Sequence, residues 1–319
     1  MLKTALCLNN YSNKNLSRRK YLKMIATSIG VVEISGCEFL KKHGNISTGH
    51  FILWQLPPQT HTQMNSYVLK TSGSRIIVID GGCSGDTLYL KGFLAALGNH
   101  VHAWFVSHPH FDHVDALIEI LNDPGQLTID KIYGSLPPES WVEKYESSAL
   151  VTSKLLNEAL SSSGHNLVEH DLGQVILIDG VQFEIIGIKN LELTNDADFS
   201  PVNNQSVVMR VTDTSQSILF TGDLGGGGGD KILNSSYRDK LRADYVQMSH
   251  HGQHGVYETF YQAVKPEYCL WPTPCWLWDN DNGGGKNSGP WLTLEVRAWM
   301  EKLTAQKHFV SGEGLCRIE

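Results

Sequence analysis

The sequence predicts one large α/β domain behind a short N-terminal segment. Apolar runs rich in β-branched residues, which are typical of strands, recur along the chain, and amphipathic stretches typical of helices lie between them. Residues 38–319 contain no repeat of fixed period and no linker rich in proline or serine. A segment of this length can bury a sizeable core. We therefore expect a single folded domain at residues 50–319.

The first 37 residues predict an export signal with a lipid attachment site. Residues 17–23 read SRRKYLK and resemble a twin-arginine signal. The apolar stretch 24–35 that follows is shorter than the roughly 18 residues that a spanning helix needs. The segment ends in ISGC, which resembles a lipobox with Cys37 as the lipidated residue. An amphipathic helix is the alternative, because Glu33 interrupts the apolar stretch.

The predicted signal peptide determines the expected domain organisation and cellular location. Residues 1–37 are expected to be a lipoprotein signal peptide, residues 38–49 a tether, and residues 50–319 the catalytic domain. The protein is then exported and lipid-anchored at the bacterial cell envelope.

The charge distribution argues against a long polyanion as partner. The formal net charge is −7 for the whole chain. It becomes −12 for residues 38–319, because the first 37 residues hold six basic residues and one acidic residue. No block rich in lysine or arginine follows residue 37. Since proteins that grip long nucleic acids contact phosphates with such blocks, we expect no long nucleic acid as a partner.

The expected helices and strands follow from the spacing of apolar residues along the chain and from the residues typical of turns. Strands are expected at 50–56, 66–70, 75–80, 101–106, 206–212 and 217–220, with a hairpin at 175–186 around an Asp-Gly turn. Helices are expected at 86–97, 113–121, 140–160, 256–264 and 292–303. The glycine run 225–229 is expected to be a flexible loop without a phosphate role, because the Gly-Lys-Ser/Thr of a nucleotide-binding loop is missing.

Residues 107–113 read Ser-His-Pro-His-Phe-Asp-His and form a turn between an apolar strand and a helix. A rigid scaffold can direct side chains in such a turn to one point. His108 and His110 share one face of an extended segment, while Asp112 and His113 turn toward a second position nearby. Imidazole and carboxylate are good ligands for zinc and similar divalent ions. A run of surface histidines is the alternative.

The pattern His-x-His-x-Asp-His after an apolar strand resembles the metallo-β-lactamase superfamily. Three further segments follow the family's order, namely a strand ending in Asp80-Gly, a strand ending in Gly-Asp223 and a strand leading to His250-His251-Gly. The resemblance covers about residues 51–319. It implies an αββα sandwich with one or two metal ions at the sheet edge.

The resemblance also implies a role for each residue. The expected metal ligands are His108, His110, Asp112, His113, Asp223 and His250. Asp223 would bridge two ions, and Asp80 would orient a ligand imidazole. Neighbouring strand residues face opposite sides, so only one of His250 and His251 is expected to bind. Either could be the ligand, and His250 is placed ahead of His251. Catalysis is expected to involve Asp112, Asp223 and His251, with Zn²⁺ as the cofactor and Mn²⁺ as the alternative.

One segment departs from the family. Many two-metal members carry another ligand histidine where this chain reads Pro-Val-Asn-Asn-Gln-Ser at 201–206. This pattern resembles a branch with the soluble domain of the competence DNA-uptake channel protein and the phosphorylcholine esterase of cell-wall teichoic acid. Asn204 is expected to be a weak ligand or a hydrogen-bond donor to the substrate. The first ion would have fewer protein ligands, so the number of bound ions, one or two, remains open.

The resemblance implies a hydrolase that uses a metal-bound hydroxide, but the fold serves many substrates. Tryptophans at 270–279 suggest a loop over the metals whose aromatic faces accept a quaternary ammonium group, with simple packing as the alternative. We expect a phosphodiesterase for a small or headgroup-type substrate. The alternatives are an extracellular nuclease for short strands, a thioesterase or lactonase, and a non-catalytic surface binding protein. Cys269 and Cys275 are spaced to close a small disulfide loop, but spacing leaves their pairing open.

Substitution Cys37→Ser tests the lipid anchor. Because serine cannot accept the lipid, the variant is expected to move from the membrane fraction to the soluble fraction of lysed cells. Immunoblots of the two fractions measure the partition, and an unchanged partition would contradict the anchor.

Overall fold

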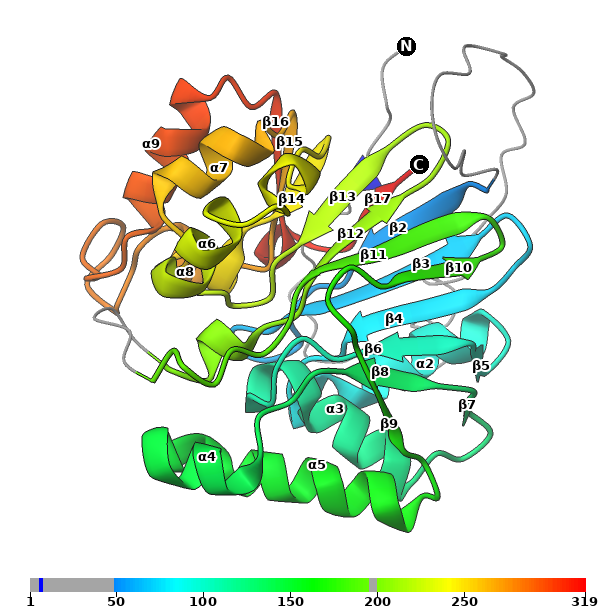
Figure 1. Cartoon of the computed structure of the whole chain (residues 1–319). Helices are drawn as coiled ribbons and strands as arrows, with labels where there is room; N and C mark the ends of the chain where they lie inside the picture. The colour runs from blue at the N-terminus through cyan, green and yellow to red at the C-terminus, as the bar shows by residue number, and fades with distance from the viewer. Residues whose placement is uncertain (1–5, 8–48, 195–199) are drawn as a thin grey trace.

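The computed structural model describes residues 6–7, 49–194 and 200–319. The predicted signal peptide, Cys37 and nearly all of the tether lie outside these residues, apart from the short strand β1 (Leu6–Cys7). Two mixed β-sheets form the inner layers, and helices cover the outer face of each (Figure 1). No helix in the described part of the chain is both long and apolar enough to cross a membrane.

The first sheet takes its strands from both ends of the chain. Its spatial order is β1, β17 (Cys316–Ile318), β2 (Phe51–Gln55), β3 (Ser66–Thr71), β4 (Ile76–Asp80), β6 (Ala103–Phe105), β8 (Ile132–Gly134) and β9 (Leu167–Glu169). Neighbours from β1 to β4 are antiparallel, and those from β4 to β9 are parallel. A separate pair joins β5 (His100–Val101) to β7 (Thr128–Ile129).

The second sheet belongs to the second half of the chain. Its order is β10 (Val175–Ile178), β11 (Val181–Gly187), β12 (Val208–Thr212), β13 (Ser217–Phe220), β14 (Tyr245–Gln247), β15 (Tyr268–Trp271) and β16 (Lys307–Val310). It is antiparallel up to β13 and parallel from β13 to β16. The carboxyl ends of parallel strands meet at one edge, where ligands bind in open α/β sheets.

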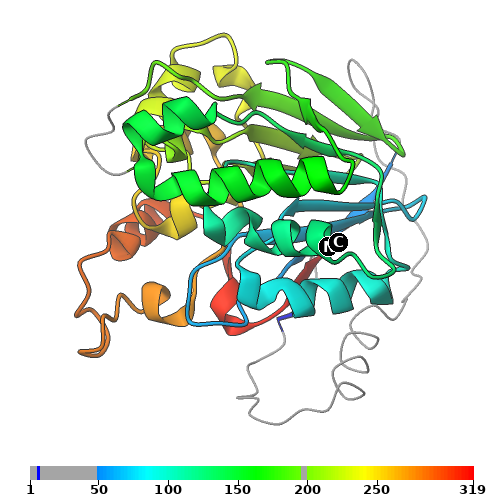
Figure 2. The same ribbon diagram turned by 90° about the horizontal axis from the view of Figure 1, so that it is seen from below.

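Helices cover the two outer faces (Figure 2). The first half supplies α2 (Thr87–Ala96), α3 (Phe111–Asn122), α4 (Glu139–Tyr145) and α5 (Leu150–Ser162). The second half supplies α6 (Gly226–Leu233), α7 (Glu258–Val264), α8 (Cys275–Trp278) and α9 (Thr293–Lys302). The 3₁₀ turns are η1 (Ser84–Asp86), η2 (Ser147–Ala149), η3 (Asn203–Gln205), η4 (Arg238–Lys240), η5 (Ser249–Gly252) and η6 (Ser311–Glu313).

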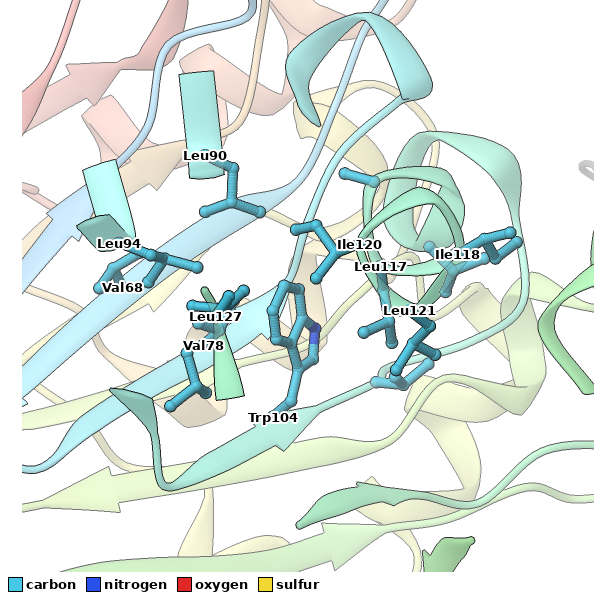
Figure 3. Close-up of a cluster of buried hydrophobic side chains, with 14 of the residues drawn as sticks. Val68, Val78, Leu90, Leu94, Trp104, Leu117, Ile118, Ile120, Leu121 and Leu127 are labelled. Atoms are coloured by element: carbon cyan, nitrogen blue, oxygen red, sulfur yellow. The ribbon is translucent and has the colours of Figure 1, made fainter. Parts of the chain in front are cut away.

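Three layers of apolar side chains separate these four layers of secondary structure. Between the sheets, Phe183 and Phe220 of the second sheet pack with Tyr67 of the first. Under α2 and α3, Trp104 packs with Leu117 and other side chains (Figure 3). A third cluster lies between the second sheet and helices α6, α7 and α9. The predicted αββα sandwich is therefore confirmed.

The prediction for the glycine run was wrong, because residues 226–233 form helix α6. A Cβ at Gly226 would collide with the Tyr257 ring, and one at Gly229 would lie 2.9 Å from Val256 Cγ1. These glycines let the helix approach the segment before α7 closely, and that packing outweighs their low helix propensity. The disulfide is also absent, since Cys269 is a buried thiol and Cys275 an exposed one.

Candidate metal centre

Four connections bring the predicted site residues together at the sheet edge. Asp80 ends β4, and Asp223 follows β13. His108 and His110 lie in the extended segment between β6 and α3. Helix α3 begins at Phe111, two residues earlier than predicted. Asp112 and His113 therefore lie in its first turn, and η5 after β14 carries His250 and His251.

Close approach of two loops depends on Gly222, the residue before Asp223. Its φ is +53°, a conformation that residues with a Cβ rarely adopt. A Cβ at this position would lie 2.9 Å from Ser107 Cβ and 3.0 Å from Ser206 Cβ. Glycine thus lets the strand that delivers Asp223 meet the segment that delivers His108.

One group of ligand atoms comes from Asp112, His113, Asp223 and His251, all of them buried. His251 Nε2 lies 3.2 Å from Asp112 Oδ2 and 3.3 Å from Asp223 Oδ2. His113 Nε2 lies 3.2 Å from Asp223 Oδ1. We call this the four-ligand group.

A second group comes from His108, His110 and Asp223. His108 Nε2 lies 3.0 Å from His110 Nδ1 and 3.9 Å from Asp223 Oδ2. We call this the three-ligand group. Asp223 belongs to both groups, so its carboxylate lies where the sequence placed a bridging ligand.

Partners outside the groups determine which nitrogen of each imidazole faces inward. His113 Nδ1 lies 2.8 Å from Asp80 Oδ2, and His251 Nδ1 lies 2.8 Å from the Pro272 carbonyl oxygen. His110 Nε2 lies 2.9 Å from Glu146 Oε1. Because these partners accept hydrogen bonds, the bonded nitrogen carries the hydrogen. The other nitrogen of each neutral ring then presents a lone pair to its group.

Asp80 holds this outer arrangement in place. Its Oδ1 accepts a hydrogen bond of 2.8 Å from Ser107 N, and its Oδ2 accepts one of 2.7 Å from Asn65 Nδ2. Ser107 Oγ donates to Asp80 Oδ2 at 2.8 Å and lies 3.1 Å from His108 Nδ1. Asp80 thus contacts His113, as the sequence-based hypothesis required, and also links the loop that carries His108.

The residues present fit a divalent cation. His113 Nε2, His251 Nε2 and Asp223 Oδ1 are buried and have no hydrogen-bond partner among the described residues. Buried polar atoms normally have partners. Here acceptors face acceptors, so only a proton or a cation can lie between them. Imidazole nitrogen with carboxylate oxygen is a donor set that suits zinc and similar ions.

The electrostatics of the four-ligand group agree with this assignment. Burial lowers the pKa of His251, but the carboxylates of Asp223 and Asp112 outweigh burial and raise it to about 9. Burial raises the pKa of Asp112, yet the imidazoles of His251 and His113 hold it well below its usual value. The group therefore stabilises positive charge, and a bound ion would displace the protons that otherwise supply it.

The order of the adjacent histidines is the reverse of the prediction. Neither residue continues a regular strand, since φ is +48° at His250 and +55° at His251. This turn directs His251 Nε2 into the four-ligand group. His250 Nδ1 instead bonds the His254 carbonyl oxygen, and its Nε2 stays 4.0 Å from Asp223 Oδ2. The structure therefore favours His251 as the ligand.

The contact of Asn204 Oδ1 bears on the ligand alternative alone, and the expected role of Asn204 as a hydrogen-bond donor to the substrate stays a prediction. Asn204 Oδ1 accepts a hydrogen bond of 2.9 Å from Gly228 N, so this oxygen is directed to α6 rather than to the three-ligand group. Ser206 lies nearer, with Oγ 3.3 Å from His108 Nδ1. Sequence reasoning also missed two residues that contact the ligands. Glu146 contacts His110, and Gln63 Nε2 donates to Asp112 Oδ2 at 3.2 Å. No spacing pattern connects these residues to the ligands, so only the fold reveals them.

A separate group lies at the surface, where His100, His102 and Asp130 place ligand atoms close together. His100 Nε2 and Asp130 Oδ1 are 2.7 Å apart, and both side chains are about half exposed. These two atoms are hydrogen-bonded to each other, unlike the inward atoms of His113, His251 and Asp223.

The variants His251→Ala and His250→Ala test the revised ligand assignment. His251→Ala is expected to weaken zinc binding by at least about 10-fold, since it removes one donor from a buried group. His250→Ala is expected to retain the bound zinc. Zinc per chain, measured by mass spectrometry after dialysis, distinguishes them, and the opposite pattern would restore His250 as the ligand.

Comparison with known proteins agrees with this geometry. The metallo-beta-lactamase superfamily model matches residues 60–259. Among solved structures, the metallo-beta-lactamase fold protein YhfI from Bacillus subtilis is 12% identical, with a TM-score of 0.51 over 83% of this chain and 99% of that chain. Unliganded yeast PDE1 is 13% identical, with a TM-score of 0.51 over 84% of this chain and 99% of that chain. A search of the curated proteins gives no match.

The family match spans well over half of the chain and includes all the residues of both ligand groups. The chain belongs to the metallo-beta-lactamase superfamily.

Proposed function

We propose that this protein is a zinc-dependent phosphodiesterase that acts on a small or headgroup-type substrate. The observation that carries the proposal is Asp223, whose carboxylate is shared by two groups of ligand atoms. Two neighbouring cation sites are the arrangement used by many enzymes that hydrolyse phosphate esters. Since this fold supports several hydrolytic reactions, the substrate class is argued from charge and aromatic side chains.

The residues have distinct proposed tasks. Bound divalent ions would lower the pKa of water toward 7 and stabilise negative charge that develops on the substrate. Asp112, His113, Asp223 and His251 would hold one ion, and His108, His110 and Asp223 the other. Asp80 keeps the hydrogen of His113 on Nδ1. The partly exposed His250 would contact the substrate, since His251 is among the ligands of the four-ligand group.

Charge supports a small substrate. The net charge of the chain is −7, and the acidic excess grows if the basic N-terminal segment is removed. Such a surface repels long polyanions and tolerates a substrate with a cationic head. The pattern at residues 201–206 supports the branch that includes the phosphorylcholine esterase.

The tryptophans divide into two sets. Trp271 is fully buried, and the Arg297 guanidinium lies 3.9 Å above the ring of Trp278, so both belong to the packing of the second half. Trp276 and Trp291 pair with ring centroids 4.9 Å apart. Trp276 Nε1 donates to the His61 carbonyl oxygen.

This bond joins the aromatic pair to the segment that carries Gln63. Gln63, two residues beyond His61, donates to Asp112 of the four-ligand group. The pair of Trp276 and Trp291 therefore supports a quaternary ammonium headgroup, which aromatic faces bind by about 0.5–2 kcal/mol.

The export signal and lipid anchor belong to the same proposal, because a headgroup-type substrate would be met at the cell envelope. Their support is the order of the twin-arginine and lipobox patterns in residues 17–37.

A substrate panel tests the proposed activity. Zinc-loaded protein is expected to hydrolyse bis-p-nitrophenyl phosphate and, more efficiently, p-nitrophenyl phosphorylcholine, as followed by p-nitrophenolate absorbance. Asp223→Asn is expected to lower kcat/KM by at least about 100-fold, because both groups lose a charged ligand.

The panel also contains a short oligonucleotide, a lactone and a thioester. Turnover of a lactone or thioester without phosphodiester cleavage would contradict the phosphodiesterase proposal. Preference for the oligonucleotide would favour the nuclease alternative.

A further inference from the structure

The two ligand groups differ in how firmly the protein holds them. The four-ligand group is enclosed, with side chains at most 4% exposed. The three-ligand group has one donor fewer and includes His110, whose side chain is 16% exposed. A partly exposed imidazole can rotate about its bonds unless a further contact restrains it.

Glu146 supplies that contact from the turn between α4 and η2. Its Oε1 lies 2.9 Å from His110 Nε2. Its Oε2 accepts hydrogen bonds from Val202 N, at 2.8 Å, and from Ser200 Oγ. Two donors thus occupy Oε2, and Oε1 is left to accept a hydrogen bond from His110.

This contact determines which atom of His110 can bind an ion. Oε1 of Glu146 accepts the hydrogen of His110 Nε2, which leaves the lone pair of the neutral ring on Nδ1. That Nδ1 is the atom that lies 3.0 Å from His108 Nε2. The Ser200 hydroxyl lies 3.5 Å from His110 Nε2, a longer and weaker contact than the one of 2.9 Å from Glu146.

We propose that Glu146 is a positioning residue that fixes the tautomer and orientation of His110 and so sets the affinity of the three-ligand group for its ion. This inference rests on the proposed two-ion function. It makes the three-ligand group the weaker site and gives this group, but not the four-ligand group, a dependence on Glu146. A carboxylate behind a ligand histidine changes metal affinity by about 10–100-fold.

Zinc titration of the full chain tests this proposal. All proteins in this titration carry His100→Ala, which removes the surface group, and the chain with no other change serves as wild type. This chain, Glu146→Ala and Glu146→Gln are dialysed against buffered zinc and analysed by mass spectrometry. We expect Glu146→Ala to bind the weaker ion about 10–100-fold less tightly and the tighter ion unchanged. Glu146→Gln keeps a neutral acceptor, so its affinity for the weaker ion is expected to lie between those of wild type and Glu146→Ala.

Two control variants separate positioning from structural support. Glu143→Ala removes an exposed carboxylate from the neighbouring helix α4 and is expected to bind both ions as wild type does. Ser200→Ala removes a bond to Oε2 and the 3.5 Å contact of the hydroxyl with His110 Nε2 but keeps the contact between Glu146 and His110, and it is also expected to retain both ions. Equal loss of the weaker ion in Ser200→Ala and Glu146→Ala would overturn the proposal.

The ¹⁵N shifts of the His110 ring give a readout independent of activity. We expect a hydrogen on Nε2 in wild-type protein and a mixture of tautomers in Glu146→Ala. If wild type binds two ions and Glu146→Ala binds both with unchanged affinity, the role of Glu146 is refuted while the proposed function stands. If wild type binds no ion, the proposed function fails. Should Glu146→Ala not fold, Glu146→Gln alone decides by the same criteria.

Discussion

The structure depends on a cluster of buried acceptor atoms that face one another without a protein donor between them. The inward nitrogens of His113 and His251 and an oxygen of Asp223 have no hydrogen-bond partner among the described residues. Such an arrangement is costly unless positive charge enters it. Each imidazole is held from behind by an acceptor or a hydroxyl, so its lone pair stays directed inward. The metal centre follows from this constraint rather than from any one ligand.

The fold meets this constraint at the edge where both sheets end. The first half of the chain delivers the His-x-His-x-Asp-His segment, and the second half delivers Asp223 and His251. Residues of unusual backbone conformation gather at the junction, since Asp80, His250 and His251 all have positive φ. Local strain of this kind persists where the surrounding structure enforces it and is concentrated at functional sites. Stability is thus given up locally to place the ligands.

The sequence predicted the parts of the site that depend on local spacing. The positions of Asp80 and Asp223 at strand ends, and of the histidines before α3, follow from short patterns, and the structure brings these residues together. The choice between His250 and His251 was not predictable, because a turn replaces the strand geometry. Helix α6 and Glu146 were also missed, since tertiary packing and a contact 36 positions away determine them.

Anomalous diffraction at the zinc edge, from crystals of the zinc-loaded protein, tests the central claim most directly. The account predicts two peaks that flank Asp223, one among Asp112, His113 and His251 and the other beside His108 and His110. If the anomalous map of the zinc-loaded protein shows no peak at either position, the facing acceptors do not form a metal centre.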